Sequence, residues 1–273
     1  MKIVDTHSHF NLHQFEHDLP ESITQMVEAE VGTICVGIDL ATSDHAMRLA
    51  QENLNIWACV GQHPTEWEKS FEENEFRKLL SEPRVVAVGE CGLDYFREKS
   101  EELMAKQKDL FLKQIKLAHE ADLPLMLHIR PSASTMPALS SLGEAGDAYE
   151  DALEILESYK KSWPEMCGTA HFFAGTKEIA QRFLDIGFYI SFSGVITFVP
   201  EYEEVVKFVP LDRILPETDA PFATPTPHRG KRNQPEYVLE VVKKIAEIKG
   251  LSTEETETQL LKNTKTLFAI DII

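Results

Sequence analysis

Residues 2–9 read Lys2-Ile3-Val4-Asp5-Thr6-His7-Ser8-His9, a short apolar run that ends in two histidines. Successive side chains of a β-strand point to opposite faces, so we expect His7 and His9 to project from the same side. Two imidazoles presented in this way can bind one metal ion, and a strand holds them more rigidly than a loop does. An ordinary polar strand edge is the alternative interpretation of this pair.

Short apolar runs alternate with longer amphipathic segments along the chain. We predict strands at residues 2–9, 33–38, 56–63, 84–90, 123–128, 168–171, 188–193 and 213–219. The predicted helices include residues 22–30, 42–53, 100–121, 148–162, 176–186 and 235–249. Four of them have a capping side chain at their start: Ser22, Thr42, Ser100 and Thr176. This alternation predicts an α/β fold, a closed parallel (β/α)8 TIM barrel.

An open, doubly wound sheet is the alternative architecture. Such a sheet often carries a glycine-rich phosphate loop after its first strand, and the chain contains neither a GxGxxG nor a P-loop sequence. No linker or repeat divides the chain, so we predict one barrel domain over residues 1–273, with residues 252–269 packed on its outside. Residues 131–147 are small and polar, and we expect them to form an inserted loop over the active face or a tolerated insertion without function.

Composition excludes several classes of protein. No run of about 18 apolar residues is present, and a charged strand follows the first residue at once, so we expect no membrane span and no signal peptide. The cysteines are isolated, which favours buried, reduced thiols rather than disulfides or a zinc knot. We expect a cytoplasmic, monomeric enzyme. A formal charge of −18 argues against a broad basic surface for nucleic acid. An anionic substrate would therefore need bound metals or a local basic patch.

Later strand-like runs also end in side chains that can bind a metal. With the first pair they form the predicted ligand set His7, His9, Glu90, His128, His171 and Asp219. The carboxyl ends of barrel strands meet at one mouth, where barrel enzymes have their active sites. Four imidazoles and two carboxylates exceed the needs of one tetrahedral ion and suit two divalent ions that share a bridging carboxylate. Glu90 is the best bridge, because it follows a buried apolar strand in which an unpaired carboxylate would be costly.

Such a centre predicts metal-assisted hydrolysis. Two divalent ions about 4 Å apart lower the pKa of a shared water and stabilise charge on a phosphoryl or carbonyl oxygen. We predict that Glu90, Asp219 and His63 are catalytic: Asp219 could take a proton from the attacking water, and His63 could contact substrate or carry a proton, unless it is a plain turn residue. The ligand types leave the metal open among Zn²⁺, Mn²⁺, Mg²⁺, Fe²⁺ and Co²⁺.

Several sequence blocks match one known family in the same order. They read Asp5 with His7-Ser8-His9, Gly61-Gln62-His63-Pro64, Gly89-Glu90-Cys91-Gly92-Leu93-Asp94-Tyr95, Leu127-His128-Ile129-Arg130, His171-Phe172-Phe173-Ala174-Gly175, Glu217-Thr218-Asp219-Ala220-Pro221 and Arg229-Gly230-Lys231-Arg232-Asn233-Gln234-Pro235. Together they resemble the TatD family of metal-dependent hydrolases. The resemblance implies a barrel of the amidohydrolase type, the six ligands named above, divalent metals and deoxyribonuclease activity. Similar members are assigned deacylase activity on mischarged tRNA, so the resemblance defines the chemistry better than the substrate. The chain departs from the family at Ser8, often a cysteine there, and in the 131–147 insertion.

Further residues are assigned to the surroundings of the predicted centre. Asp94 and Tyr95 follow Glu90 closely and could orient it or a ligating histidine, or be structural. Predicted substrate-binding residues are Arg130, Arg229, Lys231 and Arg232, the last three forming a basic patch in an acidic chain. The aromatic residues that could stack on an unpaired base are Phe172, Phe173, Phe192 and Phe198. Of these, Phe192 and Phe198 also fit the core or its rim.

The predicted function is divalent-metal-dependent hydrolysis of phosphodiester bonds, as by an exonuclease that acts on the ends of single-stranded DNA. The residues themselves indicate a two-metal hydrolase, and the step to a nuclease comes from the family resemblance. The alternatives are an ester hydrolase, such as a D-aminoacyl-tRNA deacylase with tRNA as its partner or a lactonase. A catalytically silent metal-binding scaffold is a further alternative, although degenerate barrels usually lose ligands that this chain retains.

Overall fold

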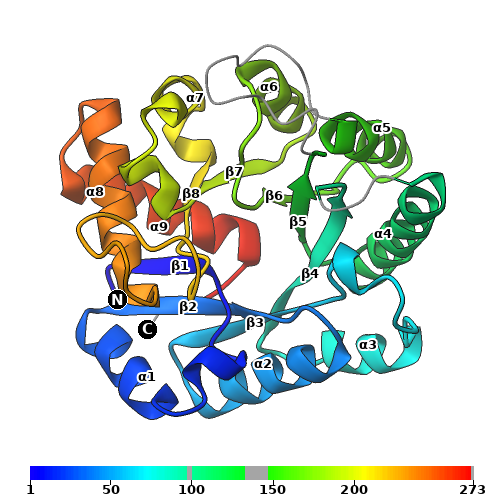
Figure 1. Ribbon diagram of the computed structural model, residues 1–273, viewed down its shortest axis with the longest axis horizontal. Coiled ribbons are helices and arrows are strands. Elements are labelled where there is room, and N and C mark those ends of the chain that lie inside the picture. The colour runs from blue at the N-terminus through cyan, green and yellow to red at the C-terminus, as the bar shows by residue number, and fades with distance from the viewer. Residues whose placement is uncertain (97–99, 133–146, 272–273) are drawn as a thin grey trace.

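A computed structural model describes residues 1–96, 100–132 and 147–271 of the chain (Figure 1). In this part of the chain eight parallel strands form one sheet, in which each strand pairs with the next one in sequence. A bridge between Ser8 and Ala220 joins the first strand to the segment after the last strand and closes the sheet. Helices surround the sheet, so the predicted TIM barrel is confirmed. The predicted inserted loop at residues 131–147 lies almost entirely outside the described residues.

Every predicted strand is present. The strands are β1 (Ile3–Ser8), β2 (Val31–Val36), β3 (Ile56–Val60), β4 (Val85–Asp94), β5 (Leu125–Arg130), β6 (Gly168–Ala170), β7 (Tyr189–Phe192) and β8 (Ile214–Pro216). The helices are α1 (Leu19–Glu28), α2 (Leu40–Glu52), α3 (Glu73–Leu80), α4 (Glu101–Ala121), α5 (Asp147–Lys160), α6 (Lys177–Asp185), α7 (Glu203–Phe208), α8 (Val238–Lys249) and α9 (Thr253–Phe268). The helices α3 and α7, of 8 and 6 residues, were not among those predicted.

The starts of the helices follow the predicted caps in part. Ser100 and Thr176 accept hydrogen bonds from backbone N–H groups in the first turns of α4 and α6, as predicted. Thr42 is the third residue of α2, because Asp39 caps that helix and forms a capping box with Thr42. Ser22 lies inside α1, because that helix begins before it with a proline in its first turn.

Apolar side chains form two layers around the sheet. The larger layer fills the space between the strands and the surrounding helices. The smaller layer fills the interior of the barrel and includes Val4, Ile34, Trp57, Met126 and Leu215. Leu267 and Phe268, at the end of α9, and Ile270, which follows that helix, join this inner layer. We predicted that residues 252–269 pack on the outside of the barrel; α9 contacts α8 there, and its last turn also shields the apolar interior from water.

The cysteines are free, as predicted, and Cys35, Cys59 and Cys91 are buried. Burial raises the pKa of Cys35 to about 12, so its thiol stays protonated at neutral pH. Within the described ranges, no helix combines the length and the apolar character that crossing a bilayer requires.

Two buried glutamines of α4 bind the backbone at strand ends on the carboxyl-terminal side of the barrel. Gln107 accepts a hydrogen bond from the N–H of Asp94 at 2.8 Å and donates one to its carbonyl at 2.9 Å. Gln114 makes the same pair of bonds with Gln62, both at 2.8 Å. Each side-chain amide therefore satisfies one backbone donor and one acceptor that water cannot reach.

Replacing Gln114 by leucine leaves the N–H and C=O groups of Gln62 buried without their partners. We expect Gln114→Leu to lower the free energy of unfolding by about 1–3 kcal/mol for each unsatisfied group, measured by urea denaturation. Gln181→Leu is the matched control, because Gln181 is exposed and bonds the side chain of Asp185. Its effect should stay within about 0.5 kcal/mol. Equal losses in the two variants would contradict a role for Gln114 in holding the strand end.

Candidate metal centre

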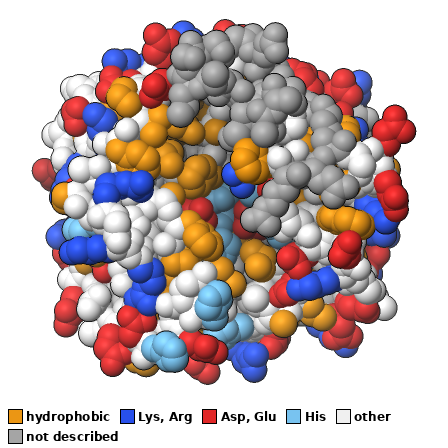
Figure 2. Space-filling view, viewed as in Figure 1, with side chains coloured by type: hydrophobic (Ala, Val, Ile, Leu, Met, Phe, Trp, Pro, Cys, Tyr) orange, Lys and Arg blue, Asp and Glu red, His pale blue; other side chains and the backbone are white. Residues whose placement is uncertain are grey.

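The six predicted ligands meet at the carboxyl-terminal end of the barrel, within the groups His7, His9 and Asp219; His63, Glu90 and His128; and His7, His171 and Glu217. They lie in or shortly after β1, β4, β5, β6 and β8. Parallel strands bring these positions together because their carboxyl ends form one rim. Figure 2 shows histidine side chains at the bottom of a hollow in this face, with hydrophobic side chains along its border.

One set of donor atoms surrounds Oε2 of Glu90. The Nε2 atoms of His7 and His9 are 3.2 Å apart and lie 3.5 and 3.7 Å from this oxygen. Oδ1 of Asp219 lies 3.9 Å from Nε2 of His7 and 3.5 Å from Nε2 of His9. Ligands about 2.1 Å from a tetrahedral ion lie about 3.4 Å from one another. His7, His9 and Asp219 are therefore spaced like ligands of one divalent ion, and Glu90 lies at a similar distance from both imidazoles.

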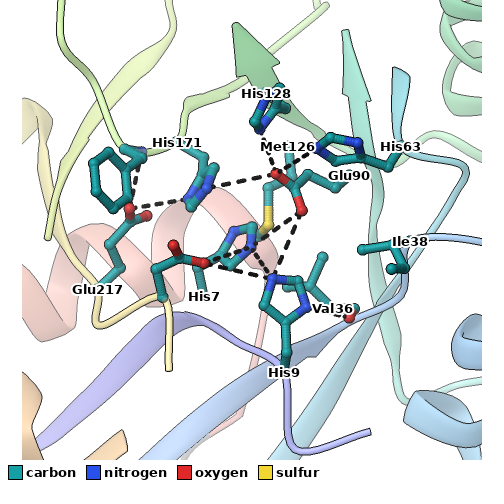
Figure 3. Close-up of polar contacts among 12 residues, drawn as sticks. His7, His9, Val36, Ile38, His63, Glu90, Met126, His128, His171 and Glu217 are labelled. Carbon is teal, nitrogen blue, oxygen red and sulfur yellow. Dashed lines mark hydrogen bonds and ion pairs between the residues drawn. The ribbon is translucent and has the colours of Figure 1, made fainter. Parts of the chain in front are cut away.

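A second set of donors faces the other oxygen of the same carboxylate (Figure 3). Oε1 of Glu90 lies 2.7 Å from Nδ1 of His128 and 3.6 Å from Nε2 of both His63 and His171. His63, which we predicted as a catalytic residue, therefore lies among the potential ligands. Imidazole nitrogens and carboxylate oxygens are the donors that divalent transition metals prefer, so these residues fit a metal centre.

Burial and charge act in opposite directions on the carboxylate at the centre. Burial alone would raise the pKa of Glu90, but the neighbouring His63 and His7 and a hydrogen bond with His128 hold this pKa well below its ordinary value. Burial and the nearby His171 lower the pKa of His7 to about 3. Glu90 is therefore ionised, and His7 is neutral with a nitrogen lone pair available for a metal.

Two acids hold the ring nitrogens of histidines from the second set. Oδ2 of Asp94 lies 3.0 Å from Nε2 of His128, and Oε1 of Glu217 lies 2.9 Å from Nδ1 of His171. Burial alone would lower the pKa of both histidines, but these acids and Glu90 raise it to about 9. Carboxylates in such positions fix the orientation of a ligating ring and increase its basicity.

Glu217 was not predicted as a site residue. It is 1% exposed, and it also accepts hydrogen bonds from the N–H of Phe172, at 2.8 Å, and from the hydroxyl of Ser191. The sequence did contain a signal for it. Glu217 precedes Asp219 by two positions at the end of a predicted strand, so strand alternation places both on one face.

The loop that carries Asp219 is fixed by residues to which the sequence analysis gave no role. Asp5 accepts hydrogen bonds from the N–H and the hydroxyl of Thr218, at 2.8 and 2.6 Å. Asn233 donates to the carbonyls of Thr218, at 2.9 Å, and of Phe222, at 2.6 Å. Between these anchors Asp219 has a φ of 58°, in the left-handed region that aspartate tolerates better than most residues. The loop thereby holds Asp219 against β1.

Three of the predicted substrate-binding residues have surfaces that a ligand could reach. The guanidinium of Arg229 packs over the ring of Phe198 at 3.8 Å, and that of Arg130 packs over Phe96 at 3.7 Å. Arg229 and Lys231 are exposed, and Arg130 is partly buried. Stacking on an aromatic ring orients an arginine while leaving its N–H groups free to bind an anion.

Arg232 and Tyr95 have other partners. The guanidinium of Arg232 binds both carboxylate oxygens of Asp18, at 2.6 and 2.8 Å, and thus links its loop to the start of α1. The hydroxyl of Tyr95 donates to Asp151 of α5 at 2.9 Å.

The aromatic residues proposed to stack on a base are only partly available. Phe173 and Phe192 are each 1% exposed, so that interpretation is wrong for them; they belong to the core. Phe172 is partly buried beside His171, and Phe198 is 37% exposed beneath Arg229.

Comparison with known proteins identifies the family. The family model described as TatD related DNase matches residues 4–269. The chain belongs to the TatD family. The uncharacterized metal-dependent hydrolase YabD of Bacillus subtilis (strain 168) is 38% identical over 274 residues, which cover 98% of this chain and 100% of that protein. The 3'-5' ssDNA/RNA exonuclease TatD of Klebsiella pneumoniae (strain 342) is 31% identical over 270 residues, which cover 95% of each protein.

Solved structures agree with this membership. The TatD homolog YJJV from Escherichia coli K12 superposes with a TM-score of 0.85 at 28% identity and covers 99% of both chains. The phosphotriesterase homology protein from Escherichia coli, at 11% identity and a TM-score of 0.63, covers 97% of this chain and 98% of its own and shares the fold alone. Membership of the TatD family, together with the clustered donors, makes this chain a metal-dependent hydrolase.

Removing the charge of Glu217 tests its role in orienting His171. We expect Glu217→Gln to weaken the binding of Mn²⁺ or Zn²⁺ to metal-free protein about 10- to 100-fold, measured by isothermal titration calorimetry. The physical reason is that His171 loses the anion that holds its Nδ1 and raises its basicity. Glu201→Gln, at an exposed position, is the control and should bind metal as the wild type does. Unchanged affinity in Glu217→Gln would remove this residue from the centre.

Proposed function

We propose that this TatD-family hydrolase cleaves phosphodiester bonds at the ends of single-stranded DNA, with two divalent ions bridged by Glu90. One observation carries the proposal: the two oxygens of Glu90 face separate sets of donors. Oε2 faces His7 and His9, which Asp219 also approaches, and Oε1 faces His63, His128 and His171. Two ions held by one carboxylate are a recurring arrangement in enzymes that displace oxygen at phosphorus.

The names of relatives support a nucleic-acid substrate. The TatD protein of Klebsiella pneumoniae is named a 3'-5' ssDNA/RNA exonuclease, and it aligns with this chain over 95% of both proteins. YabD is named only as a metal-dependent hydrolase. The name of the TatD protein therefore supports single-stranded DNA as the substrate, whereas the name of YabD supports only metal-dependent hydrolysis.

Divalent ions held at these donors would supply Lewis acidity, which would acidify a water and offset negative charge on a phosphoryl oxygen. The side chain of Asp219 is 16% exposed, against 4% for Glu90, so Asp219 is the carboxylate that can accept a proton from an attacking water at the solvent side. His63 has its Nδ1 bonded to Thr65 at 2.7 Å and points its Nε2 towards Glu90. We assign to that nitrogen the role of contacting an oxygen of the substrate or of carrying a proton.

The substrate phosphates would be bound by local cations, because the net charge of −18 repels them elsewhere. Arg229, Lys231 and Arg130 are the residues proposed for this role. We leave Arg232 out of it, because both oxygens of Asp18 already bind its guanidinium.

The central test is hydrolysis of end-labelled single-stranded DNA by metal-stripped protein resupplied with Mg²⁺, Mn²⁺ or Zn²⁺. We expect metal-dependent shortening of the DNA and its loss in Glu90→Gln, because that variant removes the shared charge. Metal analysis should find about two ions per wild-type chain and about one in His9→Ala. His119→Ala, on the exposed face of α4, is the control and should retain both ions and activity.

Absence of cleavage with every metal, in protein that still binds two ions, would overturn the nuclease assignment. Hydrolysis of a D-aminoacyl-tRNA or a lactone by the same preparation would then place the enzyme among the ester hydrolases.

A second prediction separates phosphate-binding arginines from structural ones. Arg229→Ala should raise the KM for DNA and reduce the magnitude of the slope of log affinity against log salt concentration by about 1, because one phosphate contact is lost. Arg232→Ala should leave that slope unchanged and lower the melting temperature, because Asp18 loses its partner. The two effects are measured by fluorescence anisotropy at several salt concentrations and by thermal unfolding. A reduced salt slope in Arg232→Ala together with an unchanged salt slope in Arg229→Ala would contradict these two roles.

A further inference from the structure

We infer that Phe222 is a stacking surface for an unpaired nucleobase next to the metal centre. The inference rests on the proposed function and adds a base-binding subsite to it. Phe222 is absent from the residues that the sequence analysis assigned to the site, and it has no part in binding metal. Its position and exposure carry the argument.

Phe222 lies directly beside the ligands. Its ring centroid is 6.3 Å from that of His9, in an edge-to-face arrangement, and its N–H donates to the carbonyl of Asp219 at 2.8 Å. Yet the residue is 47% exposed, whereas His9 beneath it is 3% exposed. The phenylalanine thus presents apolar surface to solvent directly beside a predicted metal ligand.

The backbone of Phe222 is held firmly although its ring is exposed. Asn233, which is completely buried, donates to the carbonyl of Phe222, and Asp219 accepts from its N–H. Single exposed apolar residues are common on protein surfaces and need no explanation. An exposed ring whose backbone is anchored on both sides next to the reactive centre is different, because it loses little further entropy when a ligand stacks on it.

Cationic and aromatic groups continue on the same loop. Arg229 donates to the carbonyl of Thr224 at 2.8 Å, two positions after Phe222, while its guanidinium covers Phe198. An exposed ring on the same loop as an exposed guanidinium suits a nucleotide, whose base stacks while its phosphate pairs with the cation. Stacking is also the contact that an acidic protein can offer a polyanion without relying on net charge.

The occupant is an unpaired base rather than a base within a duplex. Bases in a duplex present their edges in the grooves, and their faces are already stacked on one another. A free face is available only in single strands or frayed ends. Phe222 would therefore favour single-stranded ends over duplex and would accept any of the bases.

The test compares enzyme and substrate changes together. Two oligothymidylates carry non-hydrolysable methylene phosphonate linkages at their ends; in one, the terminal nucleotides at both ends are natural, and in the other they are abasic. Dissociation constants are measured by fluorescence anisotropy in Mg²⁺ with wild-type protein and with Phe222→Ala. We expect Phe222→Ala to weaken binding of the natural oligonucleotide about tenfold or more, and to bind the abasic one as the wild type does. Phe222→Trp should restore the preference for the natural oligonucleotide.

Phe208→Ala is the matched control, because Phe208 is 40% exposed at the end of α7 and belongs to no part of the site. It should bind both oligonucleotides as the wild type does. Equal weakening of both oligonucleotides by Phe222→Ala, or no weakening of either, would overturn the subsite.

The same experiment separates this inference from the proposed function, because binding to these oligonucleotides requires no hydrolysis. Base-dependent binding through Phe222 without cleavage of ordinary DNA would retain the subsite and refute the nuclease. Cleavage of ordinary DNA without base-dependent binding would retain the nuclease and refute the subsite. Hydrolysis of an aminoacyl ester without base-dependent binding would refute both.

Discussion

A carboxylate buried at the centre of a barrel has to be neutralised by its surroundings, and Glu90 imposes that requirement on this structure. Histidines from several strands surround it, three around Oε1 and two around Oε2. Of these, His128 and His171, whose pKa values are raised to about 9, carry the compensating positive charge. Further acids, Asp94 and Glu217, then hold the outer nitrogens of His128 and His171. Charge thus alternates outward from one side chain. A bound divalent cation would take the place of the protons on these imidazoles, because an imidazole must be deprotonated at the nitrogen that binds a metal.

The rim of the barrel is arranged to keep these side chains in place. Asp5 and Thr218 connect the first strand to the segment after the last one, and Asn233 fixes the same segment from a later loop. Gln107 and Gln114 hold two other strand ends from α4. Backbone groups at strand ends lack a neighbour in the sheet, so buried side chains replace it. Precision at a metal centre depends on such supporting contacts as much as on the ligands.

The fold and most of the ligands could be predicted because their signals are local. Strands are marked by apolar residues at every second position or by a continuous apolar run. The residues at or near the end of such a run include His7, Glu90, His128 and His171. Closure of the parallel strands into a barrel then brings the carboxyl ends of the strands together, whatever the details of side-chain packing. Helix boundaries were less predictable: Ser22 has the chemistry of a cap, yet a proline before it starts α1 earlier.

By itself, the sequence determined the barrel, the chemical types of the ligands and the TatD resemblance, because each depends on residue type and spacing along the chain. The tertiary structure alone decided which ligands face which oxygen of Glu90. It also decided that Asp5 binds Thr218, 213 positions away, that Asp18 occupies Arg232, 214 positions away, and that Phe222 remains exposed while Phe192 is buried. These outcomes depend on contacts between distant segments, and no local pattern encodes which side chain a distant segment will meet.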